Sequence, residues 1–148
     1  MALEVDQVLV PVEGSEASMD AAELAVSIAE RYGADLHVLY VLGEAVARGM
    51  EAGDIDEDSI AAESRTFVDD VRAMAPDDLR VESSMAYGFS TVRKRVHPGS
   101  VILDCAEQLD TDFLVVPRES KSGGEEGEVL EKAAEYVLLY ASQPVLSV

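Results

Sequence analysis

Short apolar runs alternate with helical stretches along the whole chain, and this alternation constrains the fold more than any other feature. The first run, Gln-Val-Leu-Val-Pro-Val at 7–12, is continuous, as in a parallel strand covered on both faces. Apolar residues at helical spacing follow at 21–32, between an N-cap at Ser15 and a stop at Gly33. The same reasoning predicts strands at 36–42, 80–86, 113–116 and 145–148, and helices at 59–75, 100–109 and 129–141.

The order β-α-β-α-β-α-β-α-β predicts a single doubly wound α/β domain, in which a mostly parallel sheet carries helices on both faces. Ligands of such sheets bind beyond the carboxyl ends of the strands. The loops at 12–15, 41–44 and 117–128 are therefore the candidate site. Residues 43–57 are rich in glycine and acids, and we expect an irregular or partly helical connection there.

Length and cysteine content limit the class of protein. The 148 residues suit one domain, which we expect to span 1–148. The single cysteine, Cys105, allows no intramolecular disulfide and favours a cytoplasmic location. The N-terminal residues carry early acids and no long apolar run, so we expect neither a signal peptide nor a membrane span.

The charge balance is strongly acidic. Thirty Asp and Glu residues against eleven Lys and Arg give a net charge of −19. Such a field repels phosphate backbones and anionic lipid surfaces, so we expect neither nucleic acid nor membranes as partners. Because only three of the basic residues are lysines, the composition indicates adaptation to a saline cytoplasm; the alternative is an acidic protein of an ordinary cytoplasm.

Five segments in the expected order resemble the universal stress protein family. They are residues 8–18 (VLVPVEGSEAS), 31–39 (RYGADLHVL), 111–116 (TDFLVV), 134–138 (AEYVL) and 143–148 (QPVLSV). The family usually carries Asp where this chain has Glu13. The resemblance implies a five-stranded parallel sheet of order 3-2-1-4-5, like that of adenine nucleotide alpha hydrolases. Combined with the acidic composition, this resemblance implies a haloarchaeal-type source.

The last strand is the predicted dimer interface. The resemblance implies a homodimer through Val145, Leu146, Ser147 and Val148, and an apolar edge strand of this kind is protected by pairing with its copy. The alternative is that the strand pairs only within its own sheet and leaves its outer edge to solvent.

Many members of that family bind ATP through a loop of the form Gly-x2-Gly-x9-Gly-Ser/Thr after the fourth strand. This chain has Gly124-x2-Gly127, but only three residues separate Gly127 from Glu131, which stands where the last glycine is expected. Five glutamates crowd the segment and oppose a triphosphate. They are Glu119, Glu125, Glu126, Glu128 and Glu131.

The resemblance also implies candidate contacts to a nucleoside. Pro11, Val12, Glu13 and Val41 match family positions on the adenine and ribose side, with Gly124 and Gly127 at the phosphates. The alternative for the first four is simple packing at the strand ends. We therefore predict weak or no ATP binding and no obligatory cofactor, with ATP or AMP as the candidate ligands.

The remaining reactive residues indicate no catalytic or metal site. His37 lies in a buried-strand pattern and Cys105 on the apolar side of a helix, so both read as core residues. The only basic cluster, Arg93-Lys94-Arg95 with His97, lies in an extension at 87–97 that forms either a solvated face or a partner contact.

We thus predict a dimeric, non-catalytic interaction module that accompanies the stress response through unidentified protein partners. The alternative is an adenine-nucleotide sensor with a variant phosphate loop. Slow ATP hydrolysis ranks third, because the sequence shows no positioned base or phosphate clamp.

Overall fold

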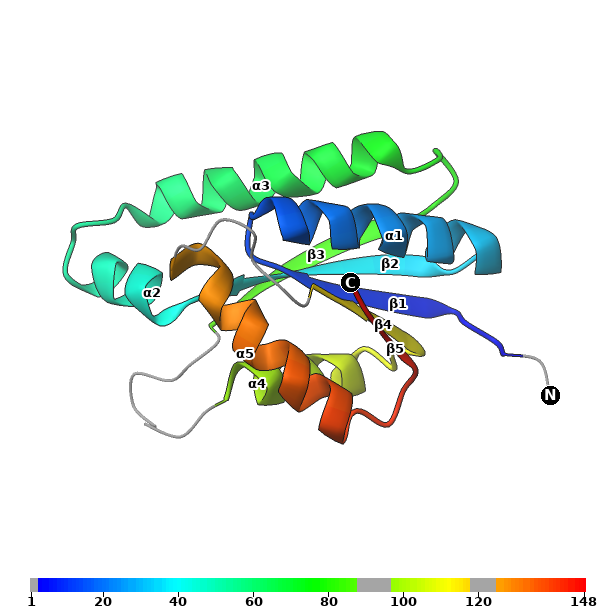
Figure 1. The fold of residues 1–148 in the computed structure, drawn as a ribbon. Helices are drawn as coiled ribbons and strands as arrows, with labels where there is room; N and C mark the ends of the chain where they lie inside the picture. The colour runs from blue at the N-terminus through cyan, green and yellow to red at the C-terminus, as the bar shows by residue number, and fades with distance from the viewer. Residues whose placement is uncertain (1–2, 88–96, 118–124) are drawn as a thin grey trace.

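A computed structural model describes residues 3–87, 97–117 and 125–148; the side chains of 44, 87 and 125–132 are not described. Within these ranges strands and helices alternate as predicted (Figure 1). The strands are β1 Gln7–Val12, β2 Asp35–Leu42, β3 Val81–Tyr87, β4 Phe113–Val116 and β5 Val145–Ser147. The helices are α1 Glu16–Tyr32, α2 Glu44–Glu51, α3 Glu57–Met74, α4 Pro98–Gln108 and α5 Glu125–Tyr140.

The five strands form one parallel sheet of order β3-β2-β1-β4-β5. This confirms the predicted order 3-2-1-4-5. Helices α1 and α3 cover one face, and α4 and α5 cover the other (Figure 1). The chain reverses direction along the sheet between β1 and β4, so the carboxyl ends of these central strands form the switch point of the fold.

Strand β1 supplies both hydrophobic cores because successive side chains point to opposite faces of the sheet. Val8, Val10 and Val12 pack with α1 and α3, whereas Leu9 packs with α4 and α5. All four are fully buried. This burial on both faces explains why the strand reads as a continuous apolar run rather than as an alternating one.

Capping residues set the helix boundaries. The Ser15 Oγ accepts a hydrogen bond from the Ser18 backbone N–H (3.1 Å) at the start of α1, and Gly33 ends the helix with φ +64°. Helix α3 starts at Glu57, ahead of the predicted 59, because the Asp56 Oδ1 accepts from the Asp58 N–H (3.1 Å).

Residues 44–51 form the regular helix α2, which fits the partly helical connection expected at 43–57. Two other helices begin earlier than predicted. Helix α4 begins at Pro98 rather than 100, because the His97 Nδ1 accepts from the Gly99 N–H (3.0 Å). Helix α5 begins at Glu125, ahead of the predicted 129; acidic residues are favourable in its first turn because of the helix dipole.

None of the helices in the described part of the chain is long and apolar enough to cross a membrane. The basic cluster at 93–95 lies outside the described residues, and His97 caps α4.

Candidate functional site

The loop that joins β1 to α1 lies at the carboxyl edge of the sheet and is closed by two serines. The Glu13 backbone N–H donates to the Ser18 Oγ (3.0 Å), and the Ser15 and Ser18 hydroxyls are 3.1 Å apart. Ser18 is fully buried, so its hydroxyl bridges the loop and the first turn of the helix. These bonds fix the direction in which the chain leaves β1.

Gly14 brings this loop close to the end of β2. Its φ is +91°, and a Cβ at this position would lie 2.7 Å from the Tyr40 hydroxyl oxygen. Tyr40 pairs in register with Val12 on the neighbouring strand, so the two side chains share a face of the sheet. Only glycine meets both the backbone and the space requirement here.

The sheet divides the predicted nucleoside contacts between its two faces. Val41 packs in the core under α4 and α5, and Pro11, which pairs with Leu39, points to the same face. Val12 packs in the opposite core under α1 and α3. Glu13 follows β1 and is partly buried.

Val12 is fully buried, so packing at the end of β1 is sufficient to explain this apolar residue. Pro11 and Val41 do lie on one face, at adjacent strands near the switch point. Of the predicted phosphate contacts, Gly127 lies in the first turn of α5, and Gly124 lies outside the described residues.

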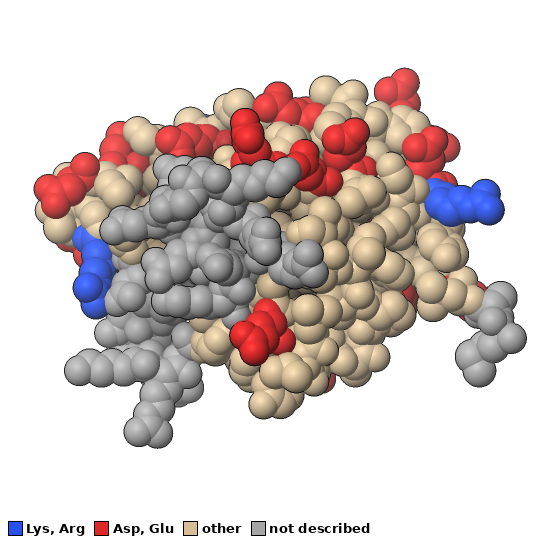
Figure 2. All heavy atoms as spheres, in the orientation of Figure 1, with Lys and Arg blue, Asp and Glu red and all other residues tan. Residues whose placement is uncertain are grey.

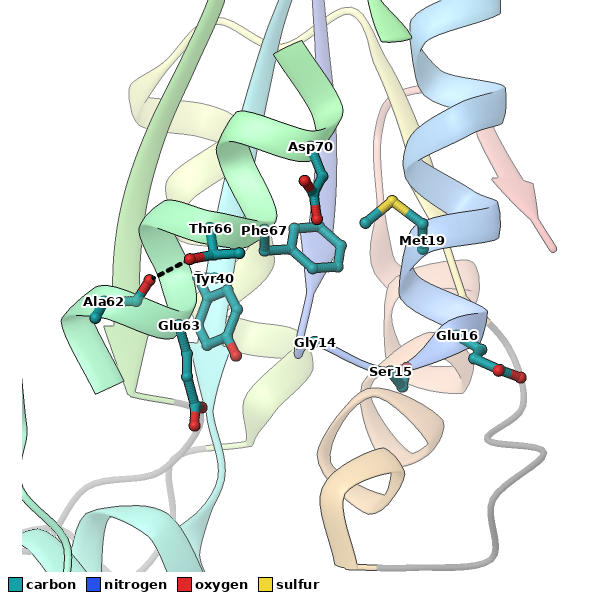
Figure 3. A pocket seen from close by; sticks show the side chains of 10 residues that line it. All are labelled: Gly14, Ser15, Glu16, Met19, Tyr40, Ala62, Glu63, Thr66, Phe67 and Asp70. Atoms are coloured by element: carbon teal, nitrogen blue, oxygen red, sulfur yellow. Dashed lines mark hydrogen bonds between the residues drawn. The ribbon is translucent and has the colours of Figure 1, made fainter. Parts of the chain in front are cut away.

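A cavity of about 520 Å³ opens beside the β1–α1 loop, between α1 and α3 (Figure 3). Its apolar surface comes from Met19 of α1, Tyr40 of β2 and Phe67 of α3. Three acidic residues, Glu16, Glu63 and Asp70, also line it, and the Glu16 carboxylate points away from the rings of Tyr40 and Phe67 (Figure 3). The remaining lining residues are Gly14, Ser15, Ala62 and Thr66.

The sequence predicts the 12–15 loop as part of the site but does not predict the α3 side of this cavity. The available signal was the spacing of Glu63, Phe67 and Asp70, which places them along one side of a helix at i, i+4 and i+7. That spacing does not reveal which element faces it, so the cavity itself depends on tertiary packing.

A polar cluster lies on the opposite face, where α4 covers β2 and β3. The His37 Nε2 and the Ser84 Oγ are 2.7 Å apart. Burial lowers the pKa of His37, although the neighbouring Glu82 carboxylate acts in the opposite direction. Burial raises the pKa of the Cys105 thiol, an effect that a hydrogen bond with Ser84 partly offsets.

The sequence predicts both His37 and Cys105 of this cluster as core residues. His37 is buried as predicted, but its Nδ1 has no hydrogen-bond partner among the described residues, so the imidazole is only half satisfied. Cys105 is partly buried against the α4–α5 core, and its raised pKa keeps the thiol protonated at neutral pH. Within the described ranges, no group of three His, Cys, Asp or Glu residues is placed to hold a metal ion.

The sheet order and the loops at its switch point define a doubly wound α/β domain with its candidate binding edge at the carboxyl ends of β1 and β2. Residues 4–148 match the family model of the universal stress protein family, and the chain belongs to this family.

Relatives of known sequence and structure are distant. The universal stress protein MJ0531 of Methanocaldococcus jannaschii is 26% identical over 146 residues, which cover 96% of this chain and 81% of that protein. A universal stress protein solved in complex with cAMP is 21% identical, with a TM-score of 0.67; the match covers 98% of this chain and 97% of that one. The universal stress protein of Archaeoglobus fulgidus solved in complex with dAMP is 18% identical, with a TM-score of 0.60; the match covers 99% and 98%. These similarities confirm the fold.

Proposed function

We propose that this universal stress protein acts as a dimeric, non-catalytic interaction module in a saline cytoplasm, and that it contacts protein partners during the stress response. The observation that carries the proposal is an exposed apolar surface at the end of α5 and on β5. We call it the α5–β5 patch; it consists of Leu138, Leu139, Tyr140 and Leu146.

The α5–β5 patch is unusual for an otherwise acidic surface. Leu139 is 69% exposed and Tyr140 is 65% exposed. Leu146 lies on β5, the last strand of the sheet, and among the described strands β5 pairs with β4 alone. An unpaired strand edge beside large apolar side chains favours pairing with the same edge of a second copy, because that pairing buries both.

Sedimentation equilibrium of the full chain in molar KCl tests the dimer. We expect a dimer for the native sequence and a monomer for Leu146→Lys, because a buried lysine at the paired edge is unfavourable. Leu24→Lys is the matched control, since Leu24 is 40% exposed and lies on α1 and not on β5. A native monomer, or equal dissociation of both variants, would contradict the proposed interface.

A second candidate function is binding of an adenosine monophosphate. The cAMP and dAMP complexes of the two similar proteins favour it, and here Pro11 and Val41 lie on one face at the switch point. With a net charge of −19, the protein penalises each additional negative charge on the ligand. The expected order of affinity is therefore cAMP, then AMP, then ATP.

Calorimetric titration with these three nucleotides, with and without Mg²⁺, tests this candidate. Saturable binding of cAMP or AMP that weakens for ATP supports the sensor function. Stronger binding of ATP than of AMP in the absence of Mg²⁺ contradicts the electrostatic argument. Absence of heat for all three, together with unchanged thermal unfolding, contradicts nucleotide binding and leaves the dimeric module.

A further inference from the structure

The cavity between α1 and α3 combines an apolar floor with carboxylates at its rim. The rings of Tyr40 and Phe67 meet edge to face, with centroids 6.2 Å apart. Both residues are nearly buried, at 6% and 7% exposure, and the Met19 thioether points toward them from α1 (Figure 3). The floor is therefore fixed by core packing and does not depend on a ligand to order it.

Among the described residues that line this cavity, every charged side chain is acidic. Glu63 and Asp70 border it from α3, and Glu16 borders it from α1. The basic residue nearest to Asp70 in sequence, Arg72, is engaged elsewhere: its guanidinium donates to the Val81 carbonyl (3.1 and 3.3 Å) and contacts the Asp69 carboxylate at 3.5 Å. The described lining of the cavity thus carries negative charge and contains no basic side chain.

The surroundings of the cavity reinforce this charge. Helix α1 contains four acidic residues and one arginine, and α3 contains five acidic residues and two arginines. Figure 2 shows acidic side chains gathered along the side of the molecule formed by these helices. A field of one sign around a hollow raises the local concentration of ligands of the opposite charge.

We propose that this cavity binds a small organic ammonium ion, in which a positively charged nitrogen is attached to an apolar body. The exposed parts of the two aromatic rings attract the cation and contact its apolar part, while Glu63 and Asp70 supply the countercharge. The volume of about 520 Å³ lies within the range of small-molecule sites, about 300–1,000 Å³.

Other classes of ligand fit the cavity less well. The three carboxylates repel an anion, which separates this cavity from any nucleotide phosphate site. A bare metal ion needs converging oxygen ligands, and the described residues contain no such group of three. Pro11 and Val41 lie on the other face of the sheet, so the proposal does not depend on nucleotide binding.

Titration of the full chain with benzyltrimethylammonium at constant ionic strength tests the proposal, with the Met19 methyl resonance as the local readout. Benzyl alcohol and benzoate serve as the neutral and anionic comparators. We expect saturable shifts at Met19 with the ammonium ion, much weaker binding of the alcohol and none of benzoate. Equal affinity for the alcohol, or no shift at Met19, would overturn the proposal.

Variants separate the cavity from the general field of the protein. Glu63→Gln and Asp70→Asn are each expected to weaken ammonium binding by about twofold to fivefold, the range of an exposed charge pair. Asp69→Asn removes the same charge from an exposed neighbour that does not line the cavity, and it should leave the affinity unchanged. An equal loss in Asp69→Asn would show that only the overall charge acts and would contradict a specific site.

Phe67→Leu tests the aromatic floor. We expect a loss of about twofold to fivefold, since a cation–π contact near a surface is of that order. Because Phe67 also packs in the core, circular dichroism is used to check that the variant folds. If it unfolds, the exposed variants Glu63→Gln and Asp70→Asn still test the proposal. Unchanged ammonium affinity in a folded Phe67→Leu protein would contradict the role of the ring.

Discussion

At the scale of single residues, Gly14 allows the β1–α1 loop to pass close to Tyr40 at the candidate site. Gly14→Ala places a Cβ 2.7 Å from the Tyr40 hydroxyl oxygen and forces an L-residue to φ +91°. We expect the free energy of unfolding to fall by about 2–3 kcal/mol, measured by urea denaturation.

Gly33→Ala is the matched control for this change. Gly33 also has positive φ, at +64°, but a Cβ there would meet nothing within 4 Å. Its substitution should cost only the backbone component, about 1 kcal/mol. Equal losses for the two variants would mean that the approach of Gly14 to Tyr40 contributes nothing.

The buried His37 makes the free energy of unfolding depend on pH. Burial holds its pKa below the ordinary 6.5, so between that lower value and 6.5 the unfolded chain binds more protons than the folded one. The free energy of unfolding should therefore decrease as the pH falls through this window.

The variant His37→Gln isolates this contribution, because glutamine cannot be charged and its amide retains a group that can hydrogen-bond Ser84. Urea denaturation at a series of pH values should show a shallower acid decrease for the variant than for the native chain. Parallel pH profiles would show that the imidazole has the same pKa in the folded and unfolded chains and would contradict the lowered pKa.

At the scale of elements, the start of α4 depends on a residue whose role the sequence does not reveal. His97 caps the helix through Nδ1 and stacks on Tyr136 of α5, with ring centroids 4.4 Å apart. Gly99 allows the approach, since a Cβ there would lie 2.6 Å from Tyr136.

We predict that His97→Ala lowers the free energy of unfolding by about 1–2 kcal/mol, because the cap and the stacked pair are lost together. His97→Asn keeps a capping side chain without the ring and should recover about half of the loss. Urea denaturation measures both variants. An asparagine variant as unstable as the alanine variant would exclude capping as a source of stability.

The same elements show what the sequence can predict. Strands β1 and β4 have the predicted bounds because burial on both faces makes them continuous apolar runs. Helices α3 and α4 begin before their apolar periodicity does, at the caps Asp56 and His97, and periodicity alone does not detect a cap.

The candidate site was predicted less completely than the fold. Ligands of doubly wound sheets bind beyond the carboxyl ends of the strands, and this rule predicts the β1–α1 loop. Val12 and Val41, however, lie on opposite faces of the sheet. The cavity joins Met19 of α1 to Phe67 of α3, residues that each read as ordinary core positions. Whether these two residues line one cavity depends on how α1 and α3 pack together, which no local pattern in the sequence predicts.

At the scale of the whole molecule, the proposed ammonium cavity and the proposed dimer surface lie on different elements. The acidic helices α1 and α3 form one side, where the proposed ammonium cavity lies. The exposed apolar residues of α5 and β5 lie at the opposite end of the sheet order from β3. Dimerisation through β5 would therefore leave the acidic side accessible in both copies.

The net charge of −19 also makes the stability of the fold depend on salt. Like charges on α1 and α3 repel one another across solvent, and this repulsion is screened as the Debye length falls from about 10 Å at 0.1 M to about 3 Å at 1 M salt. We expect the melting temperature to rise steeply as KCl increases over this range and then to level off.

Calorimetric melting in KCl, compared with melting in sucrose at low ionic strength, separates screening from a general solute effect. Sucrose stabilises through exclusion from the surface and leaves the repulsion in place, so it should not reproduce the levelling. The double variant Asp20→Asn/Glu23→Gln, which removes two exposed charges from the interior of α1, should melt higher than the native chain in low salt and like it in molar salt. A melting temperature independent of KCl would mean that the acidic surface costs the folded state nothing, and the argument for a salt-adapted protein would fail with it.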